Sequence, residues 1–177
     1  MKKILFILFI LFSLTLQANQ DKNVKVRDFV QRMQNKNEMI FNSVGGIIQN
    51  KNLTLEKKEK EIDLKVEELK KWVKSENKKE RIFKKEQETK FLTQLETNSK
   101  GIMKGILYLN EASNNLDLKM LDKAEKSFDS AVDSSARQEF KKMINMNREI
   151  INDALKLAEK SEKMAKESEK MANKYKY

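Results

Sequence analysis

Apolar side chains recur along most of this chain at alternating intervals of three and four residues, the spacing of one face of an α-helix. The first stripe predicts a helix over residues 22–44. Its seam comprises Val26, Val30, Met33, Asn37, Ile40 and Val44, with Phe29 and Phe41 beside it. We expect Gly45-Gly46 to end this helix and Asn50-Lys51-Asn52 to continue a polar connection, because Gly and Asn favour turns.

A second helix is expected to begin after Thr54, a residue type that caps helix N-termini well. Its seam comprises Leu55, Ile62, Val66, Leu69 and Val73. The stripe thins where Glu76 and Glu80 take seam positions before Phe83, and it recovers afterwards on a drifted face. We expect this helix to run unbroken to about Glu96, a length of roughly 60 Å at 1.5 Å per residue.

A turn is expected at Thr97–Gly101, followed by a shorter helix that Asn114-Asn115 ends. Asp117 then caps a helix with apolar positions at Leu118, Leu121, Ala124, Phe128 and Val132. The A-x-x-x-F-x-x-A pattern of residues 124–131 resembles the second helix of a tetratricopeptide repeat, but the chain has no second copy of it. Because such repeats need at least three copies to bury a core, the pattern predicts a single helical hairpin with a seam of small residues.

The last helix is expected to begin at Ser135, where the S-x-x-Q sequence has the form of a capping box. Its seam comprises Ala136, Phe140, Met143, Asn147, Ile150, Ala154, Leu157, Ser161, Met164, Ser168, Met171 and Tyr175. Small Ala and Ser residues bury little apolar area, so residues 158–177 are expected to form a helical extension that frays or binds a partner. Asn147 is of the kind that fixes register or oligomer state, and a homo-oligomer through this helix is one expected assembly.

The second and the last helix have matched predicted lengths, and strand patterns are nearly absent. We therefore predict an all-α fold. The architecture expected is an elongated antiparallel helical bundle with coiled-coil-like long helices and the shorter helices packed alongside. Residues 19–177 form a single domain in this prediction, since a chain of this length can bury a core of its own.

The first residues have the pattern of a secretory signal peptide. Met1-Lys2-Lys3 precedes an apolar run from Ile4 to Phe12, and Ala18 suits a cleavage site, so residues 1–18 are expected to be removed. The run is shorter than the roughly 20 residues that span a bilayer, and an uncleaved anchor is the alternative. Without a Cys at the cut, the chain is not expected to be a lipoprotein, and no later stretch predicts a membrane span. We expect an exported protein of the periplasm, the outer membrane or the cell surface.

Composition argues against most catalytic classes. The 177 residues include no Cys, His or Pro and only four Gly, so thiolate and imidazole chemistry, Cys-based zinc sites and glycine-rich phosphate loops are all missing. Glu59, Asp63 and Glu67 share a helix face at i,i+4 spacing, but interleaved lysines favour a solvated face over a cation site. We predict a non-enzymatic protein with no catalytic residue, no cofactor and no metal.

The formal charge is +10, and removal of Lys2 and Lys3 lowers it to +8. Lysines outnumber arginines by 32 to 5, which suits diffuse attraction to polyanions more than bidentate recognition; a solvated surface is the alternative. The expected partners are therefore a protein or a polyanion, such as a sulfated glycan or an anionic lipid surface. An Arg-rich patch with interleaved aromatics is missing, so nucleic acid is not expected. The side chains singled out as partner contacts are Trp72, Met164, Met171 and Tyr175, with a rim position in the bundle as the alternative for Trp72.

The MKKILFILFILF leader, the Lys-, Asn- and Ile-rich composition and the helices laced with Lys and Glu resemble the small exported helical antigens of Lyme-disease spirochaetes. The resemblance implies a helical protein at the outer surface or in the periplasm that contacts host factors. Many of those antigens are lipoproteins, whereas this chain has no lipobox Cys. The function expected is binding, by an exported envelope-associated or surface protein. The alternatives are a periplasmic holdase chaperone that assists outer-membrane assembly, and a coiled-coil spacer.

Overall fold

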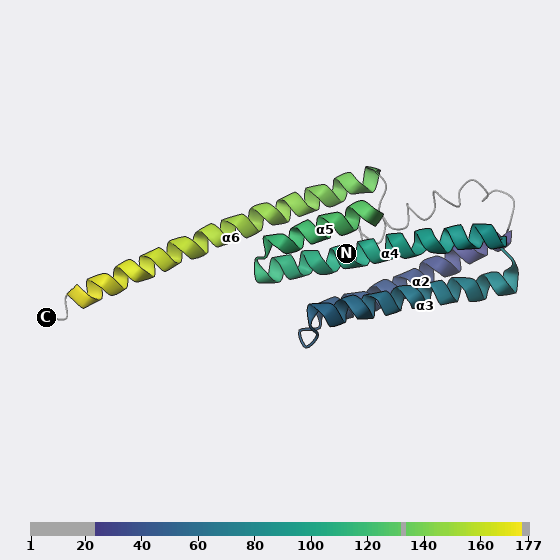
Figure 1. Cartoon of the computed structure of the whole chain (residues 1–177), viewed down its shortest axis with the longest axis horizontal. Coiled ribbons are helices and arrows are strands. Elements are labelled where there is room, and N and C mark those ends of the chain that lie inside the picture. Colours follow the sequence, from purple (N-terminus) through teal and green to yellow (C-terminus); the bar gives the residue numbers. More distant parts are fainter. Residues whose placement is uncertain (1–23, 132–133, 175–177) are drawn as a thin grey trace.

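The computed structural model describes residues 24–131 and 134–174, and every element in these ranges is an α-helix. In chain order the helices are α2 (Val24–Gln49), α3 (Leu55–Glu80), α4 (Lys85–Asn115), α5 (Leu118–Ala131) and α6 (Ser134–Lys174). Successive helices run antiparallel and pack side by side, and α6 extends far beyond the others (Figure 1). The predicted all-α antiparallel bundle is confirmed. The predicted signal peptide, Val132 and Tyr175 lie outside the described residues.

Helices α2, α3 and α4 form a three-helix bundle around two clusters of buried side chains. One cluster comprises Phe29, Met33, Leu69, Val73, Phe91, Leu92 and Leu95. The other comprises Ile40, Val44, Ile48, Ile62, Val66, Met103 and Leu107. Most positions that α2 and α3 contribute belong to the predicted seams, because a helical stripe of apolar residues is buried wherever a second helix can cover it.

Helix α2 does not end at Gly45-Gly46 as the sequence predicts but continues to Gln49. The last turn is held in place by Ile48, whose side chain is buried in the core. The buried ammonium of Lys58 in α3 donates a hydrogen bond of 2.8 Å to the Ile48 carbonyl and pairs with Glu111 of α4 at 2.8 Å. These tertiary contacts outweigh the weak helix propensity of two glycines. The following connection at Asn50–Asn52 and the N-cap at Thr54 are confirmed.

The predicted long helix from Thr54 to Glu96 is wrong, because the chain turns between α3 and α4 at residues 81–84. Arg81 takes a left-handed conformation, and its N–H bonds the Asn77 carbonyl. The buried Asn77 side chain accepts from the Phe83 N–H at 2.7 Å and donates to the Phe83 carbonyl at 3.2 Å. Phe83 packs edge-on against Phe29 and stacks on Phe91. Asn77 and the Phe83 ring thus fix a turn that contains no glycine or proline.

The predicted turn at Thr97–Gly101 is also wrong, because α4 runs through it without interruption. Gly101 and Gly105 are buried where α5 crosses α4 closely. A Cβ atom on Gly101 would lie 2.3 Å from the Ala131 Cβ atom and 2.6 Å from the Ser127 carbonyl oxygen. These glycines serve contact between two helices rather than a turn. The predicted helical hairpin with a small-residue seam is therefore formed by α4 and α5, joined after Asn115 where the sequence places the stop.

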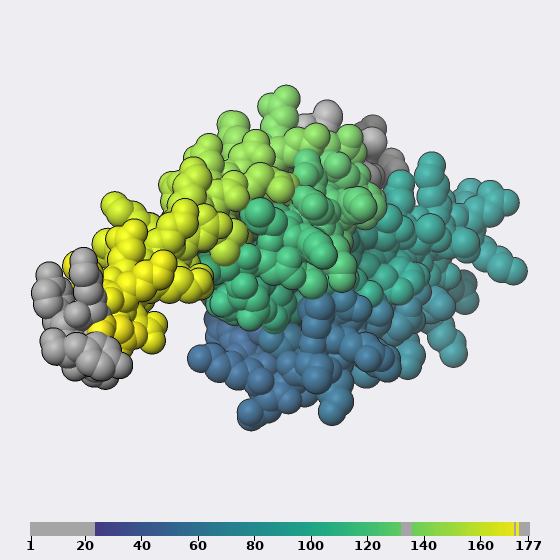
Figure 2. Space-filling model, turned by 60° about the vertical axis from the view of Figure 1, so that its left-hand side comes forward, coloured from purple at the N-terminus to yellow at the C-terminus, as the bar shows by residue number. Residues whose placement is uncertain are grey.

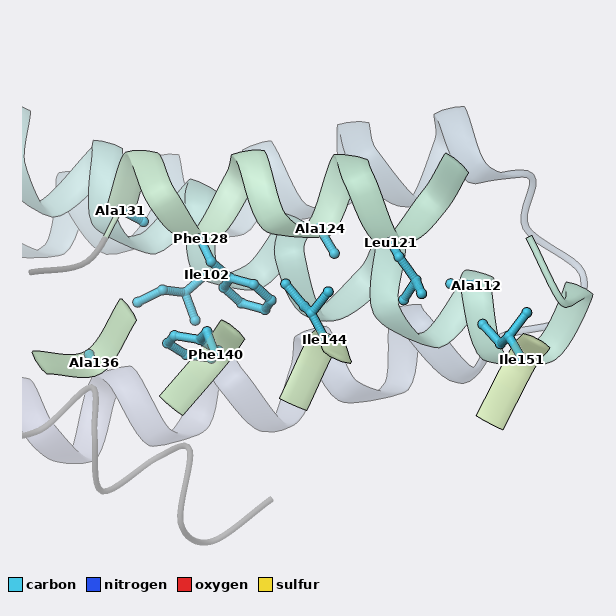
Figure 3. Close-up of a cluster of buried hydrophobic side chains, with 10 residues drawn as sticks. All are labelled: Ile102, Ala112, Leu121, Ala124, Phe128, Ala131, Ala136, Phe140, Ile144 and Ile151. Carbon is cyan, nitrogen blue, oxygen red and sulfur yellow. The ribbon is translucent and has the colours of Figure 1, made fainter. Parts of the chain in front are cut away.

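Helix α6 lies along α5 and closes a third core cluster (Figure 3). Phe128 of α5 and Phe140 of α6 stack with their ring centroids 4.0 Å apart. From α6 the cluster takes Ala136, Phe140, Ile144 and Ile151. Helix α6 begins at Ser134, one residue before the predicted N-cap. In the described ranges, no helix has the length and apolar character needed to cross a membrane.

Candidate functional site

The half of α6 that leaves the bundle is the most unusual surface of the described chain. Ile151 is the last residue of α6 that the bundle buries, with 1% of its surface exposed. Residues 152–174 continue as a single helix, and we call them the projecting segment. At 1.5 Å per residue these 23 residues extend about 34 Å. The C-terminal part of α6 stands away from the other helices in the space-filling view (Figure 2).

Polar contacts anchor α6 just before it leaves the bundle. The Ser113 hydroxyl at the end of α4 donates to the Asn147 side-chain oxygen at 3.0 Å, and the Asn147 amide donates to the Met143 carbonyl at 2.8 Å. Arg148 pairs with Asp122 of α5 at 3.0 Å. Asn147, predicted as a seam residue that fixes register, therefore pairs inside its own chain. The projecting segment begins from an anchored base.

Large apolar side chains follow the exposed side of α6 at intervals of seven residues. Ile150, Leu157, Met164 and Met171 are 62%, 68%, 55% and 59% exposed, and we call these four residues the apolar row. Scattered exposed hydrophobic residues are normal on a protein surface. Four in one row along a helix are a pattern, because residues seven apart lie nearly above one another after two turns. A row with this spacing is typical of the apolar face of a coiled-coil helix.

The predicted seam of α6 is only partly correct within the bundle. Ile150 was expected to be covered by the neighbouring helix, yet Ile144 and Ile151 are buried in its place. These two positions lie one residue further along than Met143 and Ile150, which rotates the contact face by about 100°. Helix α5 covers that rotated face, and the apolar row is left facing solvent. The sequence contains both faces but does not indicate which one the bundle uses.

The predicted partner contacts lie in two separate places. Trp72 of α3 is partly buried and stacks on Phe29, with ring centroids 5.9 Å apart, at the edge of the first core cluster. Met164 and Met171 belong to the apolar row of the projecting segment. Tyr175 lies outside the described residues. The structure therefore joins the two methionines on one surface and leaves Trp72 on another.

The acidic residues on one face of α3 are paired with groups from α4 and from α3 itself. The Tyr108 hydroxyl donates to Glu59 at 2.8 Å, and Lys104 pairs with Asp63 at 2.9 Å. Glu67 pairs with Lys70 of its own helix at 2.7 Å. Burial and then the Glu59 hydrogen bond raise the pKa of Tyr108 above its usual range. Residues 24–131 and 134–174 contain no group of three or more carboxylates placed to hold a metal ion.

A second ionic group ties α3 to α4 near the middle of the bundle. Glu96 accepts from Lys100 at 2.6 Å and also from Lys70 of α3. The two lysine hydrogen bonds lower the pKa of Glu96 from 4.5 to about 2. Such pairs position helices at a partly exposed surface, where each ion pair contributes little net free energy. Their role here is structural.

Comparison with family models, with curated proteins and with solved structures finds no match to this chain. Among the described residues, α6 carries a regular row of exposed large apolar side chains, most of it on the projecting segment.

Proposed function

We propose that this chain is an exported, non-enzymatic protein that works by binding a component of the envelope or of a host, with the projecting segment as a contact surface. The observation that carries the proposal is the exposure of the apolar row beyond Ile151. The signal-peptide pattern of residues 1–18 supports export. The resemblance to small exported spirochaetal antigens points to the same class of role.

An isolated helix of this kind has little stability of its own. Helices in water draw most of their stability from packing an apolar face against something. The projecting segment has such a face, yet no other described part of the chain lies on it. A coiled-coil partner would bury the apolar row and order the segment at the same time.

A second surface favours a polyanion as a further partner. The turn between α3 and α4 lies within residues 74–85, which contain five lysines and Arg81. The two acidic residues of this stretch, Glu76 and Glu80, both pair with Arg32 of α2, and Glu76 also pairs with Lys79. The remaining positive charge suits a sulfated glycan or an anionic lipid surface. Binding at this surface should weaken steeply as salt is raised, because such attraction is screened.

The apolar row also supports the alternative of a periplasmic holdase. Methionine side chains adapt to varied apolar surfaces, and an exposed arm that carries them suits capture of unfolded outer-membrane chains. A holdase should suppress aggregation of an unfolded membrane protein at stoichiometric ratios. If aggregation proceeds unchanged, the holdase alternative is excluded and binding to a folded partner remains.

The proposal is tested by fractionating cells that carry the wild-type chain or the double variant L157Q/M164Q. Glutamine keeps helix propensity high, so the change removes apolar surface and little else. The matched control is E159Q/K166Q, which alters two exposed residues at the same spacing on the opposite side of the helix and leaves net charge unchanged. Wild type and control should stay with the envelope fraction, and L157Q/M164Q should be released. Equal retention of all three would contradict the proposal, as would recovery of the wild-type chain in the cytoplasm.

A further inference from the structure

We propose that the partner of the projecting segment is a second copy of the same chain, packed antiparallel, with the two-fold axis between residues 162 and 163. This inference rests on the proposed function and names what covers the apolar row, a second copy of the chain, so that an envelope or host component contacts the paired segments rather than the bare row of one chain. Three independent features of the segment lead to the same orientation and register. They are the sizes of its side chains, the order of its charges and the point at which the bundle ends.

The side-chain sizes favour the antiparallel orientation. Four residues after Ile150, Leu157 and Met164 lies a small residue, and this small row comprises Ala154, Ser161 and Ser168. In a parallel pair each row faces its own copy, so serine meets serine and methionine meets methionine. In the antiparallel pair Leu157 faces Ser168 of the second copy, and Met164 faces Ser161. Large side chains then fill the space beside small ones, as close packing requires.

Alanines allow the two helices to approach closely along this interface. Ala158 and Ala165 lie one residue after Leu157 and Met164, on the other side of the small row. Both are exposed in the single chain. In the antiparallel register, Ala158 of one copy lies beside Ala165 of the other, on either side of the two-fold axis. Small residues at a helix contact let backbones come together, as Gly101 and Gly105 do between α4 and α5.

The order of charges selects one register. The exposed residues Asp153, Lys160 and Glu167 follow each other at intervals of seven beside the apolar row, with alternating sign. With the axis between 162 and 163, Lys160 of each copy lies beside Glu167 of the other. A shift of one heptad in one direction brings Lys160 against Lys160, and a shift in the other direction brings Glu167 against Glu167. Opposite charges at such positions set partner choice and alignment in coiled coils.

The length of the projecting segment fits the same register. When residue 174 of one copy ends opposite residue 151 of the other, the two segments overlap over their whole exposed length. Ile151 is where α5 stops covering α6. A heptad shift towards the bundle would bring residue 174 opposite residue 144, which α5 already covers. A shift the other way leaves one heptad of each segment exposed.

Whole-molecule charge favours the same orientation. Each mature chain has a formal charge of +8. A parallel pair would bring the two basic bundles to the same end of the coiled coil. The antiparallel pair holds them at opposite ends, which reduces their repulsion. The assembly proposed is therefore an elongated dimer with one bundle at each end.

The test is sedimentation equilibrium on the mature chain, residues 19–177, over about 1–200 µM, a range wide enough for mass action to reveal a weak dimer. Wild type and the control E159Q/K166Q should approach twice the monomer mass, and L157Q/M164Q should dimerise at least about tenfold more weakly. The single variants K160E and E167K should each be monomeric. In a dimer of either variant, residue 160 of each copy lies beside a residue 167 of the same charge, so two like-charge contacts form. An equimolar mixture of K160E and E167K should recover the dimer, since the two changed chains are complementary.

Each other outcome overturns the proposal. A wild-type chain that remains monomeric over the whole range excludes self-association, and the envelope-retention experiment then decides alone whether the segment binds something else. A dimer that is indifferent to K160E and E167K excludes this register. Binding of the monomer to vesicles of anionic lipid through the apolar row would assign the surface to a membrane instead. Circular dichroism of each variant shows whether the helices have formed.

Discussion

At the scale of single residues, the four glycines of the chain lie in two different environments. Gly45 and Gly46 are in the solvent-facing part of α2, and a Cβ atom on either would meet nothing within 4 Å. Gly101 and Gly105 are pressed against α5, and a Cβ atom on Gly105 would lie 2.5 Å from the Phe128 ring. Substitution of glycine by alanine should therefore change the free energy of unfolding in opposite directions at the two sites.

Gly46→Ala should raise the free energy of unfolding by about 0.5–1 kcal/mol, because alanine loses less backbone entropy in a helix. Gly101→Ala should lower it by about 1–3 kcal/mol, because the new methyl group overpacks against α5. Urea denaturation followed by circular dichroism measures both. If Gly101→Ala is neutral, α4 and α5 do not approach as closely as described.

Glu96 makes the stability of the bundle depend on acid. Its pKa is about 2 in the folded chain against an ordinary value of 4.5, so the folded state holds the charged form more strongly. The stability that this carboxylate contributes is complete above pH 4.5 and is lost as pH falls towards 2. Glu68 and Glu76, whose pKa values lysine hydrogen bonds also lower, act in the same direction.

Glu96→Gln should therefore cost stability at neutral pH and flatten the loss between pH 4.5 and about 2. Urea midpoints measured across this range would show the difference, with Glu159→Gln on the projecting segment as the control. A variant whose acid transition is as steep as that of wild type would contradict the role given to Glu96.

At the scale of helices, the sequence predicts elements better than it predicts their limits. The caps at Thr54 and Asp117 could be predicted because local side chains make them. Helix α4 ends where the sequence predicts, although the backbone of Leu116, in a left-handed conformation, makes the closing hydrogen bond. The turn after α3 could not be predicted, because Asn77 forms it through hydrogen bonds to Phe83 six residues away. The only signal for it is the pair of glutamates in the seam, Glu76 and Glu80. Similarly, Gly101 lies at a close contact with α5, but without knowledge of α5 the sequence around it is typical of a turn.

The sequence predicts the composition of the projecting segment, but only the structure shows which of its faces is exposed. The small residues after Leu157 indicate a weakly covered helix. Which face of α6 the bundle uses depends on the position of α5, and α5 covers Ile144 and Ile151 rather than the apolar row. The bundle buries Ala136, Phe140, Ile144 and Ile151 of α6, whereas the exposed apolar row of the same helix repeats every seven residues.

Deletion of residues 158–177 should leave the bundle folded, because the last core residue of α6 is Ile151. The truncated chain should retain its free energy of unfolding within about 0.5 kcal/mol, as expected for surface changes, and should sediment as a monomer. Loss of the folding transition on truncation would show that the core extends into the projecting segment.

At the scale of the whole molecule, the described residues form a basic bundle of five antiparallel helices, and the projecting segment extends from it as an arm. The arm, with Ile150 at its base, carries the apolar row and a row of alternating charge. If two arms pair antiparallel, the assembly carries two copies of the basic turn between α3 and α4, one on each bundle. A polyanion that reaches both would bind more tightly than to one bundle, through effective concentration alone.

Disulfide trapping tests the central claim most directly, because the chain contains no cysteine of its own. Ala158→Cys and Ala165→Cys place their thiols beside each other only in a mixed pair, whereas two copies of either variant hold their thiols apart. Under mild oxidation an equimolar mixture of Ala158→Cys and Ala165→Cys should form a covalent dimer rapidly, and either variant alone should not. Trapping of either variant alone as readily as the mixture, or no trapping in the mixture, would contradict the antiparallel pairing of the projecting segments.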